Sequence, residues 1–552
     1  MSQDGASLVL GYFRSLAPGG LPASGREGLA SCDCPVDACE KADETPKMHY
    51  PIQYESMEAA PQSQSPAPRP AKAGQRGWLS WGGGEGASPA KRGVLAVYAV
   101  LAAGLGLRLW LLGELFQVNG DSQIYGGIAK NLLQHGRYAL NGAGSEIYPT
   151  LIRLPGYPLF LAGCFGLFGM ENYWAATVVQ IALDVAGCLL LADFARRIAP
   201  AAWANRAAMA TLCLAALCPF TASYAAAPLT ETPTLFMIAL ALWAVGRFAQ
   251  RPGWMDALLF TAAVSAAALL RPDGALIGVA LAPAMALGAV RHRQDETKKG
   301  RSRLLPMAAV CILLALLPFA LWAGRNWKVF HVFQPLAPRY ATEPGEDTHP
   351  GWIRWIRSWC TDFSCTYEFY WPAPGAALNP ELLPASAFDS AQQKQETEAL
   401  VREYNDGGLE LTPAIDARFA QLAAERERAH PLRTRIGLPL KRMADMWLRP
   451  RIENLPIDLD WRNYGNHNAE TLFSWAYVAL NLGFIVLAAG GMLLRTRFWP
   501  WMLLYFFLRS ALLCTVEAPE ARYTLECFPM LFVLGGVFLA HCEDWSTKSR
   551  AG

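Results

Sequence analysis

The sequence places an acidic residue and a basic proline turn directly after its first membrane-length apolar segment. The acidic residue is Asp121, in the loop that runs to Tyr125, and the turn is Arg153-Leu-Pro-Gly-Tyr-Pro158. A positioned carboxylate can orient and partly deprotonate a hydroxyl, and a guanidinium can hold a phosphate through forked hydrogen bonds. The pattern is a poor design for a plain membrane anchor and indicates a reactive site at the membrane surface.

Ionisable and polar residues also stand at the ends of several later apolar segments. They are Glu231, Arg271 with Asp273, Arg325 with Asn326, and Glu520 with Arg522 and Tyr523. Any one of them fits the ordinary marking of a membrane interface by charge. The topology that the loop charges favour nevertheless gathers all of them on the face that holds Asp121 and Arg153, which indicates one joint site.

The elements that must position this site are membrane helices. Of the 552 residues, 53% are hydrophobic and only 17% are charged, below the quarter that is usual in soluble chains. A bilayer core needs about 20 apolar residues per helix. Apolar segments lie at 94–114, 155–170, 173–195, 207–230, 232–246, 257–270, 274–290, 304–324, 471–494, 497–516 and 525–541. We therefore expect an all-α polytopic membrane protein with about 10–12 transmembrane helices.

Basic residues decide the orientation, because they collect in short loops such as Arg196-Arg197 and Arg291–Arg303. The positive-inside rule places these loops in the cytoplasm. Counting 155–170 as a full span breaks that rule, whereas leaving this short, glycine-rich segment uncounted restores it and predicts about ten true spans. Alternatively 155–170 spans and another short segment, such as 257–270, does not.

Four regions follow from composition and topology. Residues 1–90 are rich in Pro, Ala, Ser and Gly and are expected to form a disordered cytoplasmic tail. Residues 91–324 form an N-terminal transmembrane module with a first external loop at 115–172, residues 325–470 an external region with interfacial helices, and residues 471–545 the C-terminal transmembrane helices. Cys32, Cys34 and Cys39 lack a second ligand pair, so no metal site is expected. The net charge of +2 and the absence of a basic, aromatic-interleaved domain speak against nucleic acid.

The external region carries an aromatic run from Trp352 to Trp371, which fits an interfacial element, a lid over an apolar substrate chain, or ordinary loop packing. Cys360 and Cys365 are spaced so that they could form a disulfide in an oxidising compartment. Thr412-Pro413 predicts a helix start. The basic and apolar residues of Arg433–Trp447 predict a helix lying in the membrane interface.

Three charged residues fall inside or near the ends of spans. Asp184 is expected to pair with an arginine of another helix, because unpaired charges in membranes are costly. Arg108 can extend its side chain to the surface. Arg509 could reach the outer face and join a phosphate site.

With these residues in view, the chain resembles the GT-C glycosyltransferases, in particular the protein O-mannosyltransferase and aminoarabinose-transferase branch. The matching segments are Asp121–Leu133, Arg153–Leu161, Leu229–Phe236, Leu270–Gly274, Arg325–Trp327 and Pro519–Tyr523, which lie in the family's order over about 90–541. Departures are Ser122, where many relatives have a second acidic residue, and Leu154-Pro155 in place of a double proline. The first departure leaves a divalent metal unsupported.

The resemblance implies a GT-C-type helical bundle that moves a sugar from a polyprenyl-phosphate donor to an external acceptor: lipid A, a surface glycan or a protein. Asp121 corresponds to the family's acidic residue in the first external loop, and Arg153 to its basic residue before the proline turn. Arg271, Arg325 and Arg522 are the further phosphate-binding candidates. Glu231, Asp273, Asn326, Glu520 and Tyr523 are candidates to support them or bind sugar. The branch implies a bacterial inner membrane with the site facing the periplasm, contact with membrane lipids, and no cofactor. The alternative is a transporter or flippase of a lipid-linked or anionic solute, although the sequence shows no convincing internal repeat.

Overall fold

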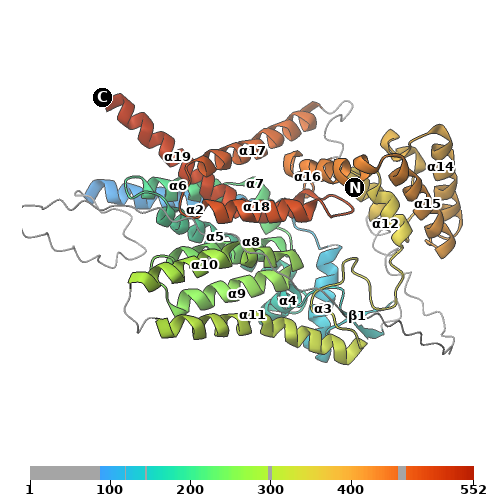
Figure 1. The fold of residues 1–552 in the computed structure, drawn as a ribbon, viewed down its shortest axis with the longest axis horizontal. Coiled ribbons are helices and arrows are strands. Elements are labelled where there is room, and N and C mark those ends of the chain that lie inside the picture. Colours follow the sequence, from blue (N-terminus) through green and yellow to red (C-terminus); the bar gives the residue numbers. More distant parts are fainter. Residues whose placement is uncertain (1–86, 119, 143–145, 296–300, 458–467, 552) are drawn as a thin grey trace, which may run out of the picture. The chain divides into compact units, whose positions relative to one another are not determined.

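The computed structural model describes residues 87–118, 120–142, 146–295, 301–457 and 468–551, which belong to one structural unit. The expected disordered tail and its three cysteines lie outside these residues, apart from a few residues at its end. The regular elements of the described part are helices, except for one antiparallel hairpin, β1 (Ala139–Asn141) with β2 (Ile147–Pro149). The predicted all-α class is therefore confirmed (Figure 1).

The N-terminal module contains ten α-helices, of which nine lie close to the predicted apolar segments and one, α3, lies in the predicted first external loop. They are α2 (Ala87–Leu115), α3 (Asp121–His135), α4 (Gly156–Phe168), α5 (Tyr173–Ile198), α6 (Ala204–Ala216), α7 (Pro219–Ala225), α8 (Glu231–Phe248), α9 (Trp254–Leu270), α10 (Leu276–Asp295) and α11 (Arg301–Phe330). Near the C-terminus follow α17 (Asn468–Leu493), α18 (Trp499–Leu513), the 3₁₀ helix η6 (Ala521–Cys527) and α19 (Phe528–Ala551).

Six stretches of the described chain are long and apolar enough to cross a membrane, so the protein is an integral, multi-pass membrane protein. They are Gly93–Leu115, Tyr173–Ile198, Pro272–Val290, Leu305–Phe330, Asn468–Leu493 and Ala521–Ser546. Three further apolar helices, α4, α9 and α18, are shorter. At about 1.5 Å per residue, the 13 residues of α4 extend only about 20 Å, too short for a bilayer core of about 30 Å. This length agrees with the interpretation that 155–170 does not span, while the total of about ten spans stays a prediction.

One predicted segment is not a continuous helix. Residues 207–230 form two helices, α6 and α7, that meet at an angle of 54°. Pro219 is the first residue of α7 and has no backbone N–H to continue the hydrogen bonding of α6, so the chain bends there. Helices α5, α8 and α9 pack in sequence, and α19 packs on α6 and α17.

The charges inside the bundle form a pair. Arg108 of α2 and Asp184 of α5 lie 2.5 Å apart, which confirms that Asp184 has an arginine partner from another helix. The expectation that Arg108 extends to the surface is wrong, because its side chain is fully buried and donates to the Ala216 carbonyl at the end of α6. Gly104 permits this arrangement, since a Cβ there lies 2.8 Å from the Ala216 oxygen. A buried guanidinium with carboxylate and carbonyl partners needs no contact with water.

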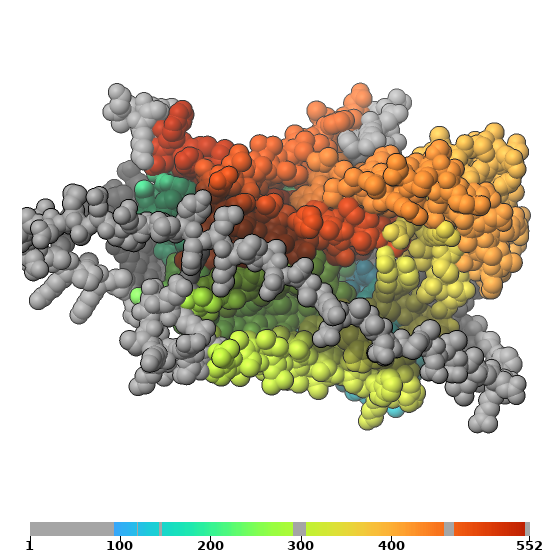
Figure 2. All heavy atoms as spheres, in the orientation of Figure 1, coloured from blue at the N-terminus to red at the C-terminus, as the bar shows by residue number. Residues whose placement is uncertain are grey.

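The predicted external region, residues 325–470, is built mainly from short helices. These are α12 (Pro350–Arg357), α13 (Phe363–Cys365), η2 (Thr366–Tyr370), η3 (Pro380–Leu382), η4 (Ala385–Ala387), α14 (Ala391–Asp406), α15 (Pro413–Ala429), η5 (Arg433–Gly437) and α16 (Leu438–Leu448). The segment from α12 to α16, yellow to orange, forms one contiguous body in Figure 2. Thr412 caps α15 by accepting the Ile415 amide, which confirms the predicted helix start. Cys360 and Cys365 form a disulfide.

The aromatic run divides into two roles. Trp352, Trp355 and Trp359 are buried, and the first two pack on Phe419 of α15, so this half is ordinary core packing. Further along, Tyr367 and Trp371 remain about half exposed. In the predicted interface segment, Arg433–Trp447, Ile436 and Leu440 are exposed four residues apart, and the placement of this segment in the membrane interface stays a prediction.

Candidate active site

Asp121 is held at the very start of α3. It follows Gly120, whose φ of 49° lies in the left-handed region that glycine adopts without strain. The first turn of a helix exposes backbone N–H groups and the positive end of the helix dipole, which favours a carboxylate there. Glu231 occupies the same position at the start of α8. Two predicted acidic residues are thus placed by helix starts.

Arg153 is held by the loop that follows the hairpin. The Tyr138 hydroxyl donates to the Arg153 carbonyl oxygen at 3.0 Å. Arg325 of α11 donates to the Tyr138 carbonyl at 2.8 Å and to the Thr150 carbonyl at 2.7 Å. Arg325 therefore joins the residue before β1 to the residue after β2 and fixes the backbone that leads to Arg153.

The proline turn then brings Arg153 to the end of α9. A Cβ at Gly156 lies 2.6 Å from the Leu269 carbonyl, so the start of α4 and the end of α9 approach with no room for a side chain. Arg271 follows α9 directly, at its C-cap. A cation is favourable at this end of a helix because the dipole is negative there.

The exposed layer of the site contains Asp121, Arg153 and Arg522. The Arg153 Nη2 atom donates to Asp121 Oδ1 at 2.6 Å, and Arg522 Nη1 lies 3.6 Å from Asp121 Oδ2. Burial by itself raises the pKa of Asp121, but the charges of Arg153, Arg522 and Arg271 outweigh it and lower the pKa to about 2. Asp121 is therefore an ionised hydrogen-bond acceptor throughout the physiological pH range.

A buried layer lies beneath it. Arg271 contacts Glu231 at 2.9 Å and Glu526 at 2.9 Å, and Asp273 lies 3.5 Å from its Nε. Arg509 contacts Asp273 at 2.6 Å and Glu526 at 2.8 Å, and it donates twice to the Tyr523 carbonyl. The side chains of Glu231, Glu526 and Arg509 are 3% exposed or less, whereas those of Asp121 and Arg522 are 29% and 21% exposed. Arg271 and Asp273 are intermediate, at 14% and 19%, close to the 17% of Arg153. The most exposed side chains, Asp121 and Arg522, can meet a substrate, and the fully buried ones hold the network in place.

Glu520 and Tyr523 connect Arg522 of the exposed layer with Arg271 of the buried layer. Glu520 accepts from Arg522 Nε and from the Tyr523 hydroxyl. The Tyr523 ring lies under the guanidiniums of Arg271 and Arg522, 5.5 and 5.7 Å from its centroid. Such contacts favour a cation over the ring face. The structure thus brings together eight of the ten residues predicted from sequence.

Two predicted residues lie elsewhere. Arg325 contacts backbone carbonyls of the hairpin region, and none of its described partners belongs to the ion-pair network. Asn326 is buried, accepts from Arg325 and donates to the Gln334 carbonyl at 2.7 Å. These contacts support a role in positioning the loop of Arg153.

Sequence reasoning did not identify Glu526, and it assigned Arg509 no fixed partner. Glu526 falls at the start of the last apolar segment, and an acidic residue in such a position is costly unless it is paired. That cost is the signal by which it could have been found. Among the described residues, the network holds four guanidiniums and five carboxylates.

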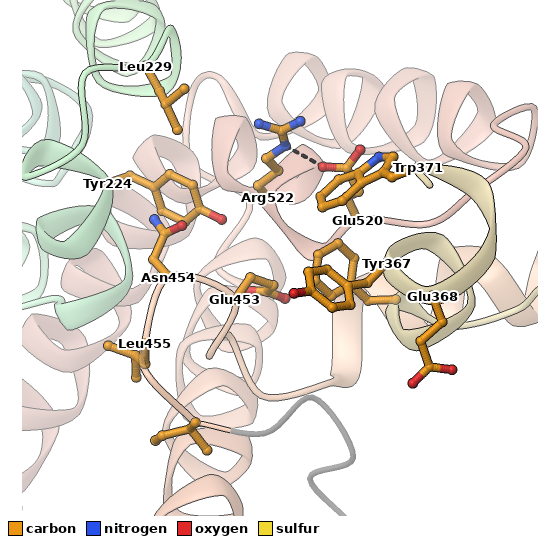
Figure 3. A pocket seen from close by; sticks show the side chains of 12 residues that line it. Tyr224, Leu229, Tyr367, Glu368, Trp371, Glu453, Asn454, Leu455, Glu520 and Arg522 are labelled. Carbon is orange, nitrogen blue, oxygen red and sulfur yellow. Dashed lines mark hydrogen bonds and ion pairs between the residues drawn. The ribbon is translucent and has the colours of Figure 1, made fainter. Parts of the chain in front are cut away.

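A cavity of about 390 Å³ opens beside Arg522 and Glu520. Its remaining lining residues are Tyr224, Leu229, Phe363, Tyr367, Glu368, Trp371, Glu453, Asn454, Leu455 and Ile457. Figure 3 shows Tyr367 and Trp371 on one side and Tyr224 and Asn454 on the other, with Glu453 between them. Thr366 ties the aromatic side to the network by donating to the Pro519 carbonyl at 3.0 Å. The second half of the aromatic run therefore forms a wall of this cavity.

Within the ranges that the structure describes, no group of three or more His, Cys, Asp or Glu side chains is arranged to hold a metal ion. Each carboxylate of the network instead has an arginine within 4 Å. The expectation of a site without metal stays a prediction.

The fold and the site together define a polytopic membrane protein with a network of arginines and carboxylates where several of its helices begin or end. Residues 153–322 match the family described as dolichyl-phosphate-mannose-protein mannosyltransferase. This match confirms the predicted resemblance over that segment, which includes Arg153, Glu231, Arg271 and Asp273. It supports the coarse class of a membrane glycosyltransferase.

Solved structures give more distant likenesses. ArnT from Cupriavidus metallidurans, bound to undecaprenyl phosphate, is 16% identical over 81% of this chain and 78% of that chain, with a TM-score of 0.35. The oligosaccharyltransferase AglB from Archaeoglobus fulgidus, in complex with an inhibitory peptide and a dolichol-phosphate, is 10% identical, with a TM-score of 0.39. The match covers 82% of this chain and about half (51%) of the AglB chain. With TM-scores this low, these likenesses add nothing to the assignment of the site. Among curated proteins nothing matches the chain.

Proposed function

We propose that the protein transfers a sugar from a polyprenyl-phosphate donor to an acceptor hydroxyl or phosphate on the external face of the membrane. The observation that carries this proposal is the contact of Asp121 with Arg153 and Arg522 at the exposed edge of the network. It places a proton acceptor beside two anion-binding groups. The family match over 153–322 supports a polyprenyl-phosphate donor.

The arginines serve the leaving group. In the transfer, an acceptor oxygen attacks the anomeric carbon, the bond from that carbon to the phosphate oxygen breaks, and polyprenyl phosphate leaves with the electron pair. A phosphate needs cationic stabilisation rather than a strong general acid, and a guanidinium supplies it through two parallel hydrogen bonds. Arg153 and Arg522 are exposed enough to make these contacts, and Arg271 stands behind them.

Asp121 serves the acceptor. Its pKa of about 2 makes it a weak base while Arg153 and Arg522 contact it. Because the network already holds more carboxylates than guanidiniums, a donor phosphate must compete with Asp121 for these arginines. When the phosphate takes them, the pKa of Asp121 rises, and the carboxylate can accept the acceptor's proton. Donor binding and base activation are thereby coupled.

The same proposal places the protein in a bacterial inner membrane with the network facing the periplasm. The disulfide between Cys360 and Cys365 supports an oxidising compartment for the external region. Arg197, at the end of α5, donates to Gln250, just beyond the end of α8, so this basic loop, which is predicted to be cytoplasmic, lies at the opposite end of α8 from Glu231.

The test is sugar transfer by the purified full chain in lipid nanodiscs. Polyprenyl-phosphate-linked sugars from native membranes are supplied with an extract of envelope acceptors, and mass spectrometry follows the release of polyprenyl phosphate. We expect release that requires acceptor and active protein. Release at the rate of protein-free discs, across donors and acceptors, contradicts the proposal.

A further inference from the structure

The cavity beside Arg522 contains buried polar atoms that the protein leaves without hydrogen bonds. Glu453 Oε1 and Asn454 Nδ2 are buried and have no hydrogen-bond partner in the described structure. The Glu453 side chain is only 7% exposed, and the nearest ion-pair partner, Arg449 Nε, lies 3.9 Å away. Buried polar groups are almost always hydrogen-bonded, so an acceptor and a donor in this condition indicate a ligand with hydroxyl or amine groups.

The opposite wall of the cavity is aromatic and open. Tyr367 is 51% exposed and Trp371 is 41% exposed, although large aromatic side chains are usually well buried. Trp371 makes edge contacts with Phe363 and Tyr367, and part of its surface stays open. Their chain segment is anchored by the disulfide and by the bond from Thr366 to Pro519. The wall is therefore a built surface rather than a loose loop.

We propose that this cavity binds one sugar ring that carries no carboxylate, with an apolar ring face on Trp371 and Tyr367 and hydroxyls on Glu453 and Asn454. The proposal rests on the function proposed above, since a transferase of this kind must hold the sugar of its donor or of a glycan acceptor. At about 390 Å³ the cavity lies at the small end of ligand sites, the size for a small molecule rather than a long chain.

Charge decides which sugars fit. The lining contains three carboxylates, from Glu368, Glu453 and Glu520, and one described cation, Arg522. Glu520 already contacts that cation. Arg449 lies 3.9 Å from Glu453 Oε1, yet this oxygen still lacks a hydrogen-bond donor. A carboxylate on the sugar has no proton to donate to Glu453 and is repelled by its charge. Neutral sugars, and sugars with an amine, keep their hydrogen bonds without this repulsion.

The direct test is binding of soluble methyl glycosides to the full chain in nanodiscs, measured by saturation-transfer NMR without turnover. The panel contains neutral methyl hexosides and pentosides, together with methyl β-glucoside and its carboxylated counterpart methyl β-glucuronide. We expect at least one neutral glycoside to bind and glucuronide to bind at least about tenfold more weakly than glucoside. Absence of binding by every neutral glycoside, or equal binding of glucuronide, overturns the proposal.

Three variants assign the binding to the cavity. Trp371→Ala removes an aromatic contact, which is worth about a tenfold loss of affinity at most. Glu453→Gln keeps the shape of the side chain and changes only its charge and hydrogen bonding, so it tests the site even where removal of Trp371 disturbs folding. Trp327→Ala is the matched control, because Trp327 is 59% exposed on α11 and does not line the cavity. Equal binding by all three variants and the wild type contradicts the assignment.

The source of the sugar is separated by competition. If the cavity holds the donor's sugar, polyprenyl-phosphate sugar displaces the glycoside and sugar-free polyprenyl phosphate does not. If it holds an acceptor's sugar, neither displaces it. Because binding is measured without transfer, a protein that binds glycosides but releases no polyprenyl phosphate refutes the proposed function alone, and the reverse result refutes the sugar site alone.

Discussion

Replacing Asp121 by asparagine separates the two tasks proposed for the exposed layer. The substitution keeps the size of the side chain and removes its charge and its ability to take a proton. Loss of a general base lowers the rate by about 10²–10⁴-fold. The same change also frees Arg153 and Arg522 from a carboxylate that lies 2.6 and 3.6 Å away.

The size of the second effect follows from exposure. The side chains of Arg153 and Asp121 are 17% and 29% exposed, so water screens the pair, and exposed ion pairs contribute about 0.2–1 kcal/mol. The affinity for sugar-free polyprenyl phosphate is therefore expected to stay the same or to increase by up to about fivefold. A loss of transfer by a factor of a hundred or more, at unchanged or tighter carrier binding, is the predicted combination.

The assay compares wild type and Asp121→Asn in nanodiscs, with polyprenyl-phosphate release for transfer and equilibrium binding for the carrier. Ser122→Ala is the matched control, because Ser122 is buried in the next position of α3 and carries no charge. Full transfer by Asp121→Asn refutes the assignment of the base. A carrier affinity that falls together with transfer refutes the competition between Asp121 and the phosphate.

Three further predictions concern stability and topology. Asp184→Asn leaves Arg108 buried without its carboxylate and should lower the free energy of unfolding by about 3–5 kcal/mol. The control is Glu427→Gln in the exposed pair with Arg354, which should lower it by about 1 kcal/mol or less. Equal losses of stability in thermal unfolding of the two variants would contradict the pairing of Asp184 with Arg108. Because the pKa of Asp121 is lowered from its usual value of about 3.9 to about 2, its ion pairs stabilise the fold fully above that usual value and lose their effect as the pH falls through about 2. The difference in melting temperature between wild type and Asp121→Asn should thus be constant from about pH 5 to 8, and a difference that disappears near pH 6 would refute this. A cysteine at Glu346 should react with an impermeant maleimide from outside and a cysteine at Arg251 should not; the reverse pattern would invert the topology.

The sequence predicts the helices and most of the site for one reason. Apolar length locates the spans, and the positive-inside rule orients them, so the charged residues at the external helix ends fall on one face. Asp121, Glu231, Arg271 and Arg522 lie close together in the structure because each stands at such an end. Their chemical roles remain proposals, but their proximity is observed.

What the sequence does not predict depends on packing. Arg325 also stands at a helix end that is predicted to be external, yet its side chain points to the carbonyls of the hairpin, because the rotation of a helix about its axis is not encoded in its apolar length. Glu453 and Asn454 lie in an irregular segment after α16, where no periodic pattern indicates which side chains face a cavity. Both cases require the positions of neighbouring elements.

The central claim, that the exposed arginines bind the carrier phosphate, is tested most directly by binding of polyprenyl phosphate and of the matching polyprenol to Arg153→Gln and Arg325→Gln. Charge-assisted hydrogen bonds contribute about 1.5–3 kcal/mol. Arg153→Gln should therefore lower the affinity of the protein for polyprenyl phosphate by about tenfold or more. Polyprenol should bind both variants like the wild type. Arg325→Gln, which acts only through the loop that positions Arg153, should lower thermal stability and weaken phosphate binding less than Arg153→Gln does. Equal binding of polyprenyl phosphate by Arg153→Gln and the wild type, or no preference of the wild type for polyprenyl phosphate over polyprenol, would contradict the claim.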